Sequence, residues 1–171
     1  TERYIACDTL LLSVGLIPEN ELSQGAGVKL SNVTAGAEVD DLLQTNIPGI
    51  FACGNVLQVH DLVDYVSDEA ERAGIGAANF IKQGSPAAEY VSTKSGFGVR
   101  YVLPQRFNKH ADADVSLFLR VTQPFDKVKF TVKAGDTVLA TAKRLKAAPG
   151  EMEKITVKAD MLMLIILGLK M

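Results

Sequence analysis

An apolar run that stops at a glycine and then leads into a helix-type pattern is the feature that most limits the fold of this sequence. The run covers residues 49–53, and Gly54-Asn55 ends it. After a short loop, apolar residues recur every three or four positions over residues 63–81, which is the spacing of one face of an α-helix. The order of strand, loop and helix is typical of an α/β layer.

The predicted helix has recognisable ends. Asp61 is expected to be its N-cap, with Asp64 in the first turn, because side-chain oxygens satisfy the free N–H groups there. Gly84 followed by Pro86 is expected to end it, since glycine favours the position after a helix and proline cannot continue one. The sequence therefore predicts a single long helix in this half of the chain.

A second apolar run lies near the start of the chain. Residues 7–15 are mostly apolar and end in glycine, which is typical of a strand buried on both faces. Cys7 is therefore expected in the core, and Cys53 is expected to point inward from the second run. The two cysteines form no CxxC pair and have no paired histidines nearby, so neither a zinc site nor a dithiol redox centre is predicted.

The second half of the chain has a different, period-two pattern. We predict a linker over residues 85–94, followed by a domain over residues 95–171. Several segments of this domain alternate apolar and polar residues, with turns at Ala134-Gly135-Asp136 and Pro149-Gly150 between them; such a pattern is typical of half-buried strands. The alternating segments are 99–103, 115–121, 127–133, 138–140 and 155–157. Strands at this spacing, without helices, predict a small antiparallel sandwich of immunoglobulin-like type.

Two further features of the second half bear on the sandwich. Lys127, Lys129 and Lys133 are expected on the solvated face of a strand, opposite the apolar residues between them. The apolar run over residues 161–167 is expected to be a central strand, with a frayed tail that lacks its partner as the alternative. This run is far shorter than the about 20 residues of a membrane helix. No basic signal segment opens the chain, so we expect a cytoplasmic protein without a membrane span.

Charge divides the chain at the same place as the pattern. Residues 1–84 hold four Lys and Arg against twelve Asp and Glu, whereas residues 85–171 hold fourteen against eight. Opposite net charges suggest two units that attract each other. The basic half lacks the clustered aromatic and arginine residues that bind single-stranded nucleic acid, so no nucleic-acid partner is expected.

The segment over residues 45–55, with the letters TNIPGIFACGN, resembles a flavin-binding motif. The motif belongs to the flavoproteins with two dinucleotide-binding domains, such as thioredoxin reductase, glutathione reductase and NADH oxidases. Its pattern is Thr, an apolar strand, Ala-x-Gly-Asp and then a helix. Upstream, residues 8–22 (DTLLLSVGLIPENEL) are similar to a second signature of that family, where the chain returns from the NAD domain to the FAD domain. The two signatures stand in the family's order.

The resemblance implies a flavin site that is only partly contained in this chain. It covers about half of the chain, and no Gly-x-Gly-x-x-Gly occurs in these residues, so the parts that bind the pyrophosphate and NAD are expected on absent N-terminal sequence. The implied fold is the C-terminal α/β fragment of that two-domain flavoprotein, of the FAD-dependent dehydrogenase type without a redox disulfide, covering residues 1–84. The implied partners are FAD and the missing N-terminal part of a parent protein, and a homodimer through the fragment is a further expectation.

The same resemblance implies which residues approach the flavin. Asn55 corresponds to the family's Asp and would contact the ribitol chain, with an amide in place of the carboxylate. The backbone at the start of the helix would face the pyrimidine edge of the isoalloxazine, where helix N–H groups favour the negative charge of reduced flavin. The predicted cofactor-binding residues are Gly54, Asn55, Val56, Asp61, Leu62 and Val63. His60 is a weak candidate for a catalytic base, with a satisfied polar residue or an indirect partner of the flavin as alternatives.

Two functions remain open from sequence. The first is hydride transfer between NAD(P)H and FAD by the parent protein, with the fragment inactive alone. The second is a non-catalytic β-sandwich module for interaction or dimerisation that carries a flavoprotein tail. The segment over residues 45–55 favours the first, and the basic second half favours the second.

Overall fold

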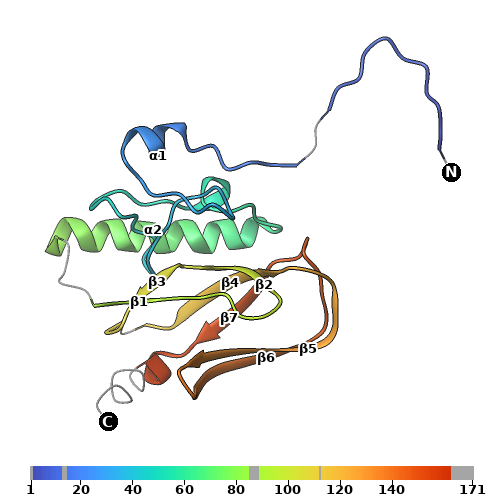
Figure 1. The fold of residues 1–171 in the computed structure, drawn as a ribbon. Coiled ribbons are helices and arrows are strands. Elements are labelled where there is room, and N and C mark those ends of the chain that lie inside the picture. The colour runs from blue at the N-terminus through green and yellow to red at the C-terminus, as the bar shows by residue number, and fades with distance from the viewer. Residues whose placement is uncertain (1, 13–14, 85–88, 112, 163–171) are drawn as a thin grey trace.

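The computed structural model describes residues 2–12, 15–84, 89–111 and 113–162 of the chain (Figure 1). One long helix lies across a layer of short strands, and a long β-hairpin forms the layer on the other side of those strands (Figure 1). The elements are α1 (Glu21–Gly25), the 3₁₀ helix η1 (Gly54–Val56), α2 (Val63–Gln83), β1 (Tyr90–Ser92), β2 (Val99–Leu103), β3 (Arg106–Asn108), β4 (Val115–Val121), β5 (Phe125–Ala134), β6 (Thr137–Ala147) and β7 (Glu153–Val157).

Helix α2 confirms the predicted helix and its C-terminal end. Gly84 follows it with φ of +72°, and its N–H donates to the carbonyl of Phe80. The predicted N-cap is wrong: Leu62 holds that position and no side chain caps the helix. Asp61 does not cap because its carboxylate accepts hydrogen bonds from Arg120 and from the backbone N–H of Met152 instead.

The buried face of α2 packs directly on the loops that precede it. Gly76 lies so close to those loops that a Cβ atom built on it would stand 2.5 Å from the carbonyl oxygen of Leu42. Glycine at this position therefore allows the helix backbone to approach the loop. Around this contact lies a core cluster whose fully buried members are Val28, Ala37, Val39, Leu43, Leu57, Ala73 and Leu103.

The two apolar runs of the first half do not form the predicted strands. Residues 7–12 belong to no strand, bend at Asp8 and are exposed, Cys7 included. A strand buried on both faces lies inside a sheet that is covered on both sides, and no described residue pairs with this segment. In the second run only Phe51 pairs, through an isolated bridge to Gln44. Cys53 is half-buried against the core cluster, as predicted.

Strands β2, β4, β5, β6 and β7 match the predicted alternating segments. The strands of the second half form three antiparallel sheets: β1 with β3, β2-β4-β7, and the hairpin β5-β6. The prediction missed β1, which falls inside the expected linker, and β3. The three lysines expected on the solvated face of β5 are exposed. An immunoglobulin-like arrangement remains a prediction, because these sheets establish only a small antiparallel β structure beside a helix.

The apolar run near the C-terminus begins as a helical turn rather than a strand. Residues 159–162 are helical, and Leu162 is buried against β4 and β7 residues in the second core cluster. The strand predicted over residues 161–167 is therefore wrong for Met161 and Leu162. Asp114 accepts the N–H of Ala159 at 3.1 Å, which helps to start this turn. Residues 163–167 lie outside the described residues.

The strand-rich part, residues 89–162, is called the β region below, and residues 2–84 the N-terminal region. The two are joined by direct hydrogen bonds. Arg106 Nη2 donates to the carbonyl of Thr45 at 2.9 Å, and the hydroxyl of Tyr90 donates to Asp40 at 2.9 Å. The N–H of Asn108 donates to a carboxylate oxygen of Asp41 at 2.7 Å. The β region therefore packs on the N-terminal region as a continuous structure.

Candidate functional site

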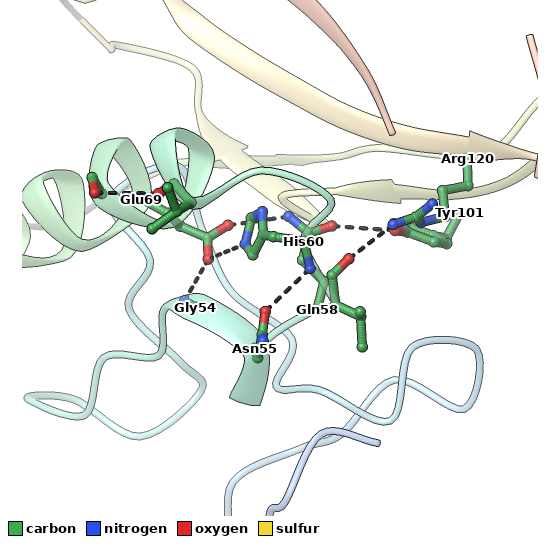
Figure 2. Close-up of polar contacts among 10 residues, drawn as sticks. Gly54, Asn55, Gln58, His60, Glu69, Tyr101 and Arg120 are labelled. Atoms are coloured by element: carbon green, nitrogen blue, oxygen red, sulfur yellow. Dashed lines mark hydrogen bonds and ion pairs between the residues drawn. The ribbon is translucent and has the colours of Figure 1, made fainter. Parts of the chain in front are cut away.

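The turn that carries the resemblance is built around Gly54. This residue has φ of +73°, a conformation that glycine adopts at no steric cost, and it starts the single 3₁₀ turn η1. Its buried N–H donates to Glu69 Oε2 at 2.6 Å (Figure 2). The chain therefore turns at Gly54 and is fixed there by a side chain from the second turn of α2.

Glu69 is the residue that organises this turn, and sequence reasoning missed it. Its side chain is fully buried, with 0% of its surface exposed. Besides the N–H of Gly54, it is approached by Gln58 Nε2 at 3.1 Å and His60 Nε2 at 2.9 Å (Figure 2). Three donors around one carboxylate compensate for its burial. One signal in the sequence could have revealed it. Glu69 stands three positions after Val66 and four before Ala73, so it lies on the apolar face of the helix, where a carboxylate needs buried partners.

Asn20 ties the two family signatures together. It stands in the upstream signature, is 5% exposed, and donates from Nδ2 to the carbonyl of Val56 at 2.8 Å and to that of Ala35 at 3.0 Å. Val56 is the last residue of η1. The turn is thus held at its start by Glu69 and at its end by Asn20.

Asn55 lies on the exposed side of the same turn. Its Oδ1 accepts the backbone N–H of His60 at 3.2 Å (Figure 2). This bond fixes which end of the amide is the acceptor, because a backbone N–H can only donate. The Asn55 side chain therefore presents its Nδ2 donor outward.

His60 lies in the interior rather than at the open side of the turn. Its side chain is 1% exposed, and its ring stands edge-on to that of Phe118 in β4, with centroids 6.3 Å apart. With Nε2 directed at Glu69, the ring has no face open to a substrate. Its other ring nitrogen, Nδ1, is buried and finds no partner among the described residues. The roles considered for His60, as a catalytic base, a satisfied polar residue or an indirect partner of the flavin, all stay predictions.

The start of α2 is the open part of the site. Leu62 and Val63 are 54% and 75% exposed, and no side chain caps the helix. The first N–H groups of a helix have no partner within it and carry partial positive charge. The helix runs for 21 residues, so this positive end belongs to a complete and well-formed helix.

The loop between η1 and α2 is held from the other side by the β region. Arg120 Nη2 donates to the carbonyl of Val59 at 2.9 Å and to Asp61 Oδ1 at 2.5 Å. Tyr101 donates its hydroxyl to Gln58 Oε1 at 3.3 Å (Figure 2). Burial raises the pKa of the Tyr101 phenol above its usual value, so this hydroxyl keeps its proton. Of the predicted site residues, Asp61 therefore faces the β region.

The exposed donors of this site fit a flavin. An outward amide at Asn55 suits a polyol hydroxyl, and free helix N–H groups suit the flavin edge that becomes negative on reduction. Within the described ranges, no group of three or more His, Cys, Asp or Glu side chains is arranged to hold a metal ion.

Comparison with known proteins relates the first part of the chain to one family. Residues 1–73 match the model of the family described as pyridine nucleotide-disulphide oxidoreductase. This segment, 73 of the 171 residues, is similar to that family. The match includes both signatures, the turn at Gly54 and the first half of α2, and it ends before the β region begins.

Two curated relatives each match part of the chain. One is an NADH oxidase of Methanocaldococcus jannaschii, 29% identical over 85 residues, which are 50% of this chain and 18% of that protein. The other is a ferredoxin–NADP reductase of Leuconostoc mesenteroides, 32% identical over 63 residues, which are 37% of this chain and 19% of the relative. The matched segment thus spans about a fifth of the length of each relative. No solved structure matches the chain significantly.

Within the part of the chain that the structure describes, no helix combines the length and the apolar character needed to cross a bilayer.

Proposed function

We propose that this chain is the C-terminal part of a flavoprotein that transfers hydride between NAD(P)H and FAD. In this proposal residues 54–63 supply the ribitol and isoalloxazine side of the FAD site. The observation that carries it is the fixed turn at Gly54, which places the outward amide of Asn55 beside the uncapped start of α2. The family assignment of residues 1–73 and the names of the two relatives support it.

The exposed apolar segment near the N-terminus supports the same proposal. Leu10, Leu11 and Leu12 are 72%, 89% and 75% exposed, although consecutive leucines of this kind are usually buried. An extended segment with free backbone edges and apolar side chains is suited to join a sheet. In the proposed parent, that sheet belongs to the dinucleotide-binding part that these residues lack.

In the proposed site FAD would supply the redox chemistry, by accepting and releasing hydride. The residues of this chain would bind and orient it. Asn55 Nδ2 would donate to a ribitol hydroxyl, and the N–H groups of Val63 and Asp64 would face the pyrimidine edge. Glu69 and Asn20 do not reach the cofactor in this proposal; they hold the turn from which Asn55 projects.

The proposal is tested in the parent flavoprotein with the substitution Asn55→Ala. We expect lower FAD content after purification and slower NAD(P)H oxidation, since a ribitol contact is lost. Gln83→Ala, at the far end of α2, serves as the control because it leaves the turn intact. Wild-type parent without bound flavin, or an Asn55→Ala protein with wild-type flavin content and turnover, would contradict the proposal.

The isolated chain provides a second test. Because it contains no glycine-rich pyrophosphate loop, we expect weak or absent FAD binding and no turnover by these residues alone. Stoichiometric flavin absorbance in the purified chain would show that the missing part is not required.

A further inference from the structure

The loop Gln58–Asp61 is held by the β region at three of its four residues. Arg120 reaches the Val59 carbonyl and the Asp61 carboxylate, as described above. The second oxygen of Asp61 accepts the N–H of Met152 at 2.5 Å. The Tyr101 hydroxyl adds the bond to Gln58. No other loop in the described N-terminal region is reached by an arginine that donates to both its backbone and its carboxylate.

The same loop leads directly to the groups proposed to bind flavin. The backbone N–H of His60 donates to the side chain of Asn55. Leu62, which follows Asp61, is the N-cap residue of α2. Gln58 shares Glu69 with the N–H of Gly54. A displacement of this loop therefore moves Asn55 and the start of α2 together.

We infer that Arg120 and Tyr101 are positioning residues of the flavin site, through which the β region sets the placement of Asn55 and of the first turn of α2. The inference rests on the proposed function. It gives the β region a role in the chemistry of the parent protein beyond that of a separate module. Neither residue touches the flavin; both act through the loop Gln58–Asp61.

The burial and charge of Arg120 support this role. Its side chain is 12% exposed, although an arginine without a special task stays mostly in water. Its guanidinium forms a charge-assisted bond with Asp61, and such bonds are shorter and stronger than neutral ones. The planar guanidinium also fixes the directions of its hydrogen bonds, which a lysine ammonium does not. An arginine in this position orients the loop as well as binding it.

The experiment uses the parent flavoprotein with FAD bound and three substitutions in the β region. Arg120→Lys keeps the charge and removes the fork, and Tyr101→Phe removes only the hydroxyl. Lys143→Met is the control, because Lys143 is exposed on β6 and takes no part in the hydrogen bonds that hold the loop. For each protein the dissociation constant for FAD, the flavin midpoint potential and the unfolding temperature are measured.

We expect Arg120→Lys to weaken FAD binding by about tenfold, equal to the loss of one charged hydrogen bond, and to shift the midpoint potential. Tyr101→Phe should show a smaller change in the same direction, and Lys143→Met should match wild type in both. Lower unfolding temperatures with unchanged affinity and potential would mean that the two residues only hold the regions together, which overturns the inference. If Arg120→Lys does not fold, Tyr101→Phe decides alone. Wild-type parent without flavin would instead refute the proposed function.

Discussion

Replacement of Glu69 by alanine tests the central claim about the site. The substitution removes a carboxylate whose side chain is fully buried and leaves the N–H of Gly54, the amide of Gln58 and the ring N–H of His60 without their acceptor. Each buried donor without a partner costs about 1–3 kcal/mol. The three costs do not add fully, since water entering the cavity recovers part of them. We therefore expect a loss of about 3–5 kcal/mol in the free energy of unfolding.

The substitution Glu69→Gln separates charge from shape. The new amide oxygen still accepts from Gly54 and His60 if its NH₂ group faces Gln58. Gln58 must then turn its own amide over, and the Tyr101 hydroxyl must accept instead of donate, which a phenol can do. This rearrangement keeps every donor paired but loses the charge on the acceptor, so the expected loss is about 1–2 kcal/mol.

The assay is urea unfolding of the chain followed by far-UV circular dichroism, with the slope of the transition compared between variants. Glu71→Ala is the matched control, because Glu71 is exposed on the same helix; it should stay within about 0.5 kcal/mol of wild type. A Glu69→Ala loss below about 1 kcal/mol, or a Glu69→Gln loss equal to that of Glu69→Ala, would refute the network as described.

Three further predictions follow from packing and charge. Gly76→Ala should destabilise the chain by about 1–2 kcal/mol, because the new Cβ would meet Leu42. Gly74→Ala should stabilise it by about 0.5–1 kcal/mol, because no atom lies within 4 Å of the new Cβ. The free energies of unfolding of the two variants are compared by chemical denaturation. Phe118→Ala, at a residue 1% exposed, should cost about 3–5 kcal/mol in the same assay. Burial raises the pKa of Tyr90 from 10.0 to about 12, so the folded state keeps a proton that the unfolded state loses. The free energy of unfolding should therefore fall as the pH rises between those two values, and it should fall less in Tyr90→Phe. An equal dependence of the free energy of unfolding on pH in both proteins would contradict this.

Much of the local structure follows from the sequence because its causes are local. The period of apolar residues places α2, and alternation places β2, β4, β5 and β7. Gly54 can be predicted as a turn because it ends an apolar run. In each case the residues that decide the structure are neighbours along the chain.

The predictions failed where a residue's partner is distant. Asp61 looks like an N-cap, yet a residue 59 positions later takes its carboxylate. Residues 7–12 look like a buried strand, but no described residue pairs with them. Glu69 reads as one of several acidic residues on a helix, and only the turn that packs against it shows why it is buried.

The contacts of the loop Gln58–Asp61 also bear on how the chain can be recombined. The sequence suggests residues 85–94 as a natural place to exchange the C-terminal half between relatives. Such a chimera would part Arg120 from Asp61 and Tyr101 from Gln58, pairs that lie on opposite sides of the crossover. A β region taken from another protein would fit only if it brought an arginine and a hydroxyl to the same places. Compatibility of these four residues is therefore a criterion for choosing donors.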